Sequence, residues 1–85
     1  MNSFASKEVE INSFTFINKQ TFKSVPKTIT VEDQRYSFVD SGLRYLVKQG
    51  QELVRLFDMS DGQNIYRLKN ADNHWTLVNI KPLSS

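Results

Sequence analysis

Apolar and polar residues alternate with a period of two along much of this chain, and short polar breaks interrupt the alternation at close intervals. A period of two places successive side chains on opposite faces of a β-strand. Short strands separated by turns are typical of all-β domains. We therefore predict an all-β fold, a small antiparallel meander of six or seven strands that curls into a barrel or roll.

The clearest turn lies at Ser60-Asp61-Gly62, with alternating residues on both sides of it. If Gly62 takes the left-handed position of a three-residue turn, the register of the flanking strands follows. The expected pairs are Met59–Gln63, Phe57–Ile65, Leu56–Tyr66 and Arg55–Arg67. This register sets one arginine directly against another, an arrangement that is destabilising in a sheet.

A second hairpin is predicted around a two-residue turn at Asp33-Gln34. Its register brings together two opposite-charge pairs and two apolar pairs, and each pair of this kind stabilises a sheet by roughly 0.2–1 kcal/mol. The expected pairs are Glu32–Arg35, Val31–Tyr36, Ile29–Phe38 and Lys27–Asp40. Before this hairpin, residues 18–21 are expected to form a loop, with Phe22 and Val25 packed at an edge of the core.

Residues 43–57 allow two interpretations. Their apolar residues also fall at helical spacing, and Asp40 or Ser41 is available as an N-cap. Against a helix stand Gly50 and several residues that favour strands. We predict two strands joined by a turn at 48–51, with Val47 opposite Glu52. The alternative is an α+β fold with a helix at 43–57.

These registers separate two faces of the sheet. One is a core face, to which Trp75 contributes the largest side chain. The other is an open face on which Arg44, Arg55 and Arg67 would form a row across neighbouring strands. Arginine binds phosphate and carboxylate groups and stacks on rings. The candidate anion or nucleic-acid face is Arg44, Arg55, Arg67, Lys69 and Phe57. Alternatively, the arginines are solvated and pair with Glu8, Glu10 or Glu52.

The open face also carries more apolar material than a solvent-exposed sheet face usually holds. The candidate apolar interface is Leu46, Leu53, Ile65, Val78 and Ile80. Either the N-terminal segment with Phe14, Phe16 and Phe22 covers these residues, or a partner chain or a second copy does.

Composition sets the scale of the fold. Eighty-five residues predict one small domain over 1–85, with frayed ends at 1–6 and 83–85. Ten aromatic residues help to fill its core, and there is no cysteine to form a disulfide. The net charge of +2 is a slight bias toward anionic partners. We recognise neither a signal peptide nor a membrane span in the sequence, and we expect a cytoplasmic protein.

Motifs that carry chemistry are scarce. His74 is the only histidine, and we expect it to be a solvated loop residue. The segment Asp58 to Gly62 resembles a calcium loop superficially, but Lys69 stands where the bidentate glutamate belongs. We therefore expect no metal, no cofactor and no enzymatic activity. The predicted function is a small binding module or accessory subunit that recognises a protein partner. Nucleic-acid binding through the arginine-bearing face is the alternative, and an enzyme comes third.

Overall fold

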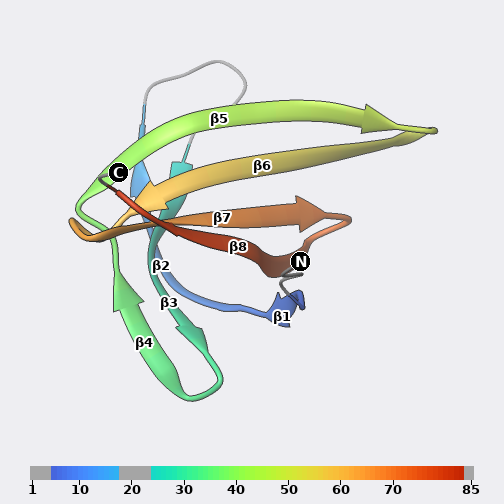
Figure 1. The fold of residues 1–85 in the computed structure, drawn as a ribbon. Helices are drawn as coiled ribbons and strands as arrows, with labels where there is room; N and C mark the ends of the chain where they lie inside the picture. The colour runs from blue at the N-terminus through green and yellow to red at the C-terminus, as the bar shows by residue number, and fades with distance from the viewer. Residues whose placement is uncertain (1–4, 18–23, 84–85) are drawn as a thin grey trace.

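A computed structural model describes residues 5–17 and 24–83, which form eight antiparallel strands in two sheets (Figure 1). The larger sheet has the order β1-β8-β7-β6-β5 and the smaller one the order β2-β3-β4. The strands are β1 Lys7–Glu8, β2 Glu10–Phe16, β3 Ser24–Val31, β4 Gln34–Ser37, β5 Asp40–Gln49, β6 Glu52–Ser60, β7 Asn64–Ala71 and β8 His74–Pro82.

The all-β prediction is confirmed, and the helical alternative for 43–57 is wrong because β5 and β6 occupy that range. The described residues form eight strands rather than the predicted six or seven, because the N-terminal stretch divides at Val9 into β1, which pairs with β8, and β2, which pairs with β3. Neither sheet formed by the described residues closes into a barrel, so the curling into a barrel or roll is not confirmed. Phe22 and the loop expected at 18–21 lie outside the described residues, as do residues 1–4 and 84–85 of the expected frayed ends.

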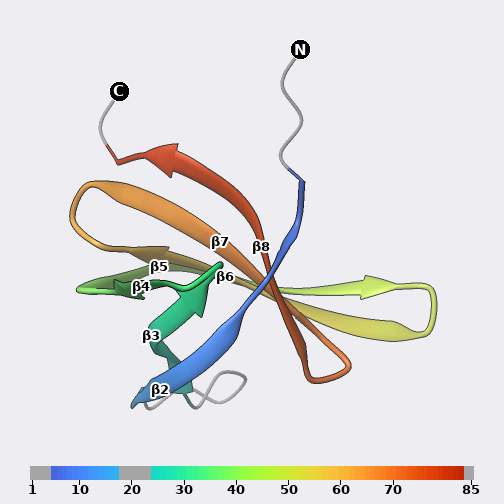
Figure 2. The ribbon, with the colours of Figure 1, turned by 90° about the horizontal axis from the view of Figure 1, so that it is seen from below.

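The two sheets pack against each other over only one end of the larger sheet. Figure 2 shows the β2–β4 layer lying across that end, while the β5–β6 hairpin projects beyond it. The core between the sheets contains Val25, Ile29, Val31, Phe38, Phe57, Met59, Tyr66, Leu68 and Leu77. Val25 is buried as expected. Burying such side chains gives on the order of 1.5–3 kcal/mol each, the main driving force for a fold without disulfides.

The β3–β4 hairpin forms where it was predicted, but its register is wrong. The turn is Glu32-Asp33, both with left-handed backbones (φ 51° and 65°), so that Val31 lies opposite Gln34 and Ile29 opposite Tyr36. The two predicted charge pairs are therefore not cross-strand pairs. The shift moves each partner by two residues, which keeps every side chain on its expected face.

The β5–β6 hairpin turns at Gly50-Gln51, where Gly50 has a φ of 64° that glycine adopts without strain. Val47 lies opposite Val54 rather than Glu52, again a shift of two residues. Phe57 consequently faces Arg44, and Leu46 faces Arg55. The predicted Arg44–Arg55 pair is wrong, although both side chains stay on one face of the sheet.

The β6–β7 register differs by three residues from the prediction, and an odd shift exchanges the two faces of one strand relative to the other. Phe57 lies opposite Leu68 instead of Ile65, and Asp58 lies opposite Arg67. Phe57, predicted on the open face, is therefore in the core. Arg55 lies opposite Asn70, so the predicted row of three arginines does not exist.

Candidate interaction surface

Arg67 belongs to a partly buried ion pair on the outer face of the larger sheet, with 35% of its own side chain exposed. Its Nε donates to Asp58 Oδ1 at 2.8 Å and its Nη2 to Oδ2 at 2.9 Å. The Asp58 side chain is only 9% exposed, and the guanidinium lies 5.2 Å from the centre of the Tyr45 ring. The hydrogen bonds to Asp58 raise the pKa of Arg67 above its usual value. Arg67 thus pairs with Asp58 rather than with the expected Glu8, Glu10 or Glu52.

Arg44 and Arg55 lie instead on the inner face of the projecting β5–β6 hairpin. Opposite residues of an antiparallel pair present their side chains on the same face, and here the opposite pairs are Leu46–Arg55 and Lys48–Leu53. We call this surface the hairpin face; it consists of Arg44, Leu46, Lys48, Leu53 and Arg55. Cations and leucines alternate on it both along each strand and between the strands.

The leucines of the hairpin face are open to solvent, Leu46 at 46% and Leu53 at 52% exposure. Phe57 follows Arg55 on the same face of β6, yet it is only 3% exposed. The difference is position, since Phe57 packs in one cluster with Val25, Ile29 and Val31 of the smaller sheet. That sheet stops short of the hairpin tip (Figure 2). The N-terminal segment therefore covers only part of the face, with β2 contributing Ile11 to the packing around the core.

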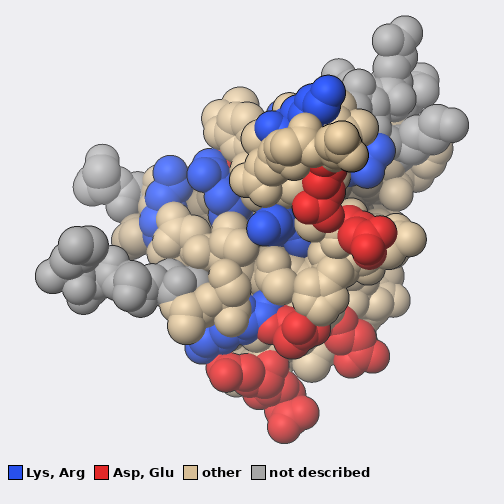
Figure 3. All heavy atoms as spheres, turned by 90° about the vertical axis from the view of Figure 1, so that its right-hand side faces the viewer, with Lys and Arg blue, Asp and Glu red and all other residues tan. Residues whose placement is uncertain are grey.

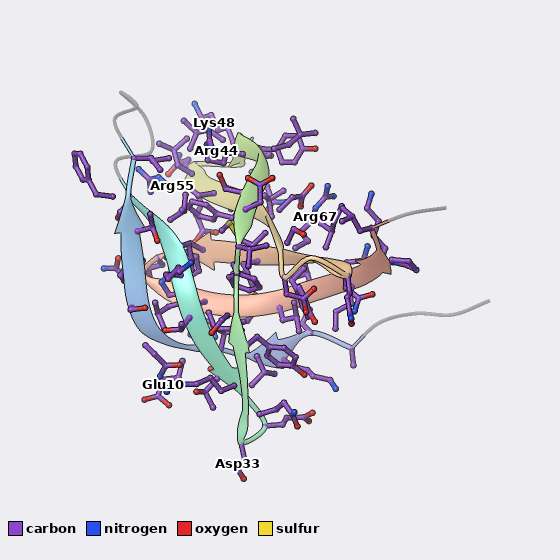
Figure 4. All side chains as sticks on the ribbon, turned by 90° about the vertical axis from the view of Figure 1, so that its left-hand side faces the viewer. Glu10, Asp33, Arg44, Lys48, Arg55 and Arg67 are labelled. Atoms are coloured by element: carbon purple, nitrogen blue, oxygen red, sulfur yellow. The ribbon has the colours of Figure 1, made fainter. Side chains whose placement is uncertain are left out.

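The three cations of the hairpin face have no ion-pair partner among the described residues, while Arg44 Nη1 donates to Ser41 Oγ at 3.1 Å. Figure 4 shows Arg44, Lys48 and Arg55 at one end of the molecule, with Glu10 and Asp33 at the other. In Figure 3, basic side chains lie at the top, on the upper left and in the middle of the visible surface, and acidic ones lie on its right side and along its lower edge. Clustered cations of this kind attract anionic groups.

Aromatic side chains border the hairpin face toward the smaller sheet. Arg55, Asn70 and Trp75 occupy facing positions on three neighbouring strands. The partly buried Trp75 ring lies 5.2 Å from that of Phe57 and 6.1 Å from that of Phe14. Phe14 and Phe16 of β2 are exposed, at 52% and 75%. The sequence allowed either these phenylalanines or a partner chain as the cover of the open face, and in the structure Phe14 and Phe16 remain exposed.

The other predicted site residues do not join the hairpin face. Lys69 lies opposite Leu56, on the outer face with Arg67. Ile65 and Val78 are half-buried, and Ile80 lies beside Tyr66 near the opposite end of β8. The predicted apolar interface is thus divided, and only Leu46 and Leu53 of its five residues are brought together.

The β6–β7 turn is organised by Asp61. Its Oδ1 accepts hydrogen bonds from the backbone N–H groups of Gln63 (2.9 Å) and Asn64 (2.8 Å), and Oδ2 accepts one from the Tyr66 hydroxyl (2.8 Å). The backbone hydrogen bond from Asn64 is the main cause that lowers the pKa of Asp61. Burial, together with the hydrogen bond to Asp61, raises the pKa of Tyr66 to about 12. These groups hold a turn in place.

Other places in the fold offer little reactive chemistry. The pocket of about 260 Å³ lined by Gly42, Leu43 and Ile65 also includes Asp58, whose oxygens already bind Arg67. His74 Nε2 lies 2.9 Å from Glu8 Oε2, so it contacts β1 rather than being only a solvated loop residue. Across residues 5–17 and 24–83, no group of three or more potential ligands could hold a metal ion. The same residues contain no helix that could span a membrane.

Comparison of the chain with protein-family models, curated proteins and solved structures finds no match.

Proposed function

We propose that this chain is a non-catalytic binding module that recognises a protein partner through the hairpin face. The observation that carries the proposal is the exposure of Leu46 and Leu53 on a projecting hairpin, each beside a cation with no ion pair in the described part of the chain. Apolar groups surrounded by charged ones are typical of interaction surfaces. A partner that covers both leucines removes apolar area from water and neutralises the cations.

Peptide display on the purified domain tests this proposal. Random twelve-residue peptides are selected on the wild-type chain, and the binders are then measured against the double variant Leu46→Ser/Leu53→Ser. We expect the selected peptides to lose at least about tenfold in affinity, equivalent to ~1.4 kcal/mol. Both leucines are exposed, so the variant should keep its fold, which circular dichroism checks.

Leu43→Ser is the matched control, because Leu43 is an exposed leucine of β5 at 63% exposure that lies outside the hairpin face. This variant should bind the selected peptides as the wild type does. Peptides that bind all three proteins equally would contradict the proposal.

Nucleic-acid binding is the second candidate, and a different observation favours it. The exposed ring of Phe14 lies 6.1 Å from that of Trp75, on the side of the hairpin face, whose three cations have no ion pair with any described residue. Single-stranded nucleic acids bind to basic grooves with stacking platforms. A labelled single-stranded oligonucleotide should then bind with an affinity that falls steeply with salt. Phe14→Ala and Arg55→Ala should each weaken it. If no binding appears at ~100 μM protein, the binding free energy is smaller than ~5.5 kcal/mol, and this candidate is eliminated.

A further inference from the structure

The outer edge of β5 has no neighbouring strand in the described structure. β5 is the last strand of the larger sheet, and its pairing with β6 is regular from Arg44 to Gln49. An unpaired edge presents backbone N–H and C=O groups that another extended chain can pair with. The other edge strands are shorter: β1 has two residues, β4 four and β2 seven, against ten in β5, so β5 offers the longest edge in the described structure.

Side chains along this edge determine which strand could dock there. Arg44, Leu46 and Lys48 lie on the hairpin face at every second position. A strand added beside β5 would lie about 4.8 Å away, with its own alternate side chains next to these three. Opposite charges in neighbouring positions stabilise such a pair, and like charges destabilise it. The intervening positions would lie beside Tyr45 and Val47 on the outer face.

The same charges disfavour a second copy of this chain as the docked strand. In an antiparallel β5–β5 pair centred on Leu46, each Arg44 would lie opposite the Lys48 of the other copy. Two like-charge pairs would flank one apolar contact. An acidic strand reverses the sign of both interactions while keeping the central apolar contact.

We infer that the β5 edge accepts an extended segment of a partner protein by strand addition, with the side-chain pattern acidic-x-apolar-x-acidic. The two acidic side chains pair with Arg44 and Lys48, and the apolar one packs beside Leu46. This inference rests on the proposed function, because it specifies what the hairpin face recognises. It adds two properties that a generic docking site lacks, which are a backbone register and a fixed spacing of charge.

A blocked, labelled peptide of sequence Thr-Glu-Thr-Leu-Thr-Glu-Thr tests the inference in a fluorescence titration against the full chain. A first control exchanges both glutamates for lysine. A second, Glu-Thr-Thr-Leu-Thr-Thr-Glu, has the same composition and charge, but its glutamates lie on the opposite face from its leucine in a strand. We expect the first peptide to bind at least about fivefold more tightly than either control, since only it matches the pattern. Equal binding of the two acidic peptides would overturn strand addition.

Protein variants locate the site. Lys48 is exposed and has no hydrogen-bond or ion-pair partner in the described structure, so Lys48→Glu should leave the fold intact. It should weaken the matched peptide about tenfold, because one attraction becomes a repulsion. The matched control is Arg35→Glu, an exposed cation on the edge strand of the other sheet, which should bind unchanged. Equal loss in both variants would mean long-range attraction without a site.

Backbone pairing has its own readout. Amide hydrogen exchange of residues 44–49 should slow when the matched peptide is bound, and replacing its leucine by proline should abolish this protection. Binding without protection would overturn strand addition. A single-stranded oligonucleotide that displaces the peptide and binds more tightly would also overturn the inference, in favour of nucleic acid.

The two proposals fail separately. If displayed peptides depend on Leu46 and Leu53 but carry no alternating acidic pattern, the binding module stands and strand addition fails. If displayed peptides ignore the hairpin face and the matched peptide does not bind at ~1 mM, corresponding to less than ~4.1 kcal/mol, both fail.

Discussion

Side chains at the two ends of strand β6 lie on the same face of the larger sheet, but those at one end are buried and those at the other are exposed. At the covered end, Phe57 and Met59 are 3% exposed, with the smaller sheet packed on them. At the open end, Leu53 is 52% exposed and Arg55 is also exposed. The alternation of residues is the same throughout, so the difference comes from the extent of the covering layer. A strand's pattern defines its faces, and only tertiary packing decides which part of a face is core.

Shortening a side chain at the covered end should have the largest effect on the free energy of unfolding. Phe57→Ala removes a buried ring that packs 5.2 Å from Trp75. We expect it to lower the free energy of unfolding by about 3–5 kcal/mol, through lost burial and the cavity left behind. Urea denaturation followed by tryptophan fluorescence measures this. A loss below ~1 kcal/mol would mean that the covered end is not the core.

Breaking the Asp58–Arg67 pair should have the next largest effect. Asp58→Ala leaves the Arg67 guanidinium without its carboxylate, in a site where the acid is 9% exposed. Removing one partner of a partly buried pair should cost about 2–3 kcal/mol, less than for a fully buried one. Arg55→Ala, at the open end, is the control and should have little effect. Comparable losses in the two variants would show that Arg55 also has a structural partner.

The covered end should also respond to alkaline pH. Burial raises the pKa of Tyr66 to about 12 in the folded chain, against about 10 when unfolded. Between these values the unfolded chain has already lost the proton that the folded one keeps, so stability falls as the pH rises from 10 through 12. The loss should be roughly 2 kcal/mol. Thermal unfolding at several pH values measures it, and Tyr66→Phe should flatten the profile relative to wild type.

The smallest effect on stability is expected at the hairpin tip. Leu53→Ala should change the free energy of unfolding by no more than about 0.5 kcal/mol, because the side chain is already half in water. The same urea titration used for Phe57→Ala measures it. A cost near that of a core truncation would mean that the leucine is covered in solution, and the contrast between the two ends would disappear.

Hairpin positions were predictable from alternation, but their registers were not. The β3–β4, β5–β6 and β7–β8 hairpins each have a two-residue turn whose first residue is left-handed. These turns are Glu32-Asp33, Gly50-Gln51 and Asp72-Asn73. Glutamate rarely takes that conformation, so a turn at Glu32-Asp33 has no clear sequence signature, whereas the neighbouring pair Asp33-Gln34 was favoured by the cross-strand pairs that it would bring together. Plausible charge pairs such as Glu32–Arg35 then supported a register two residues away from the one that forms.

The predicted arginine face depended on the β6–β7 register, the one that differs from the prediction by an odd number of residues. Gly62, with a φ of 98°, does lie in the β6–β7 turn as expected. However, Asp61 lengthens the connection by binding the N–H groups of Gln63 and Asn64, and this places Ser60 opposite Ile65. Because of this extra length, Arg67 lies opposite Asp58 and pairs with it, and Arg55 lies opposite Asn70 instead of Arg67. Side-chain control of a turn has a weak sequence signature, since aspartate is common in every kind of turn.

The divided N-terminal strand has a consequence for how the chain acquires its structure. Val9 separates β1, which pairs with β8 through Lys7–Leu77, from β2, which pairs with β3. The residues of β1 therefore pair with residues about 70 positions later in the chain, and pairings so distant in sequence slow folding. During synthesis, β2 to β4 can assemble early, whereas β1 stays unpaired until β8 has been made. The pairing of β1 with β8 therefore cannot form before the C-terminal strand of the larger sheet is present.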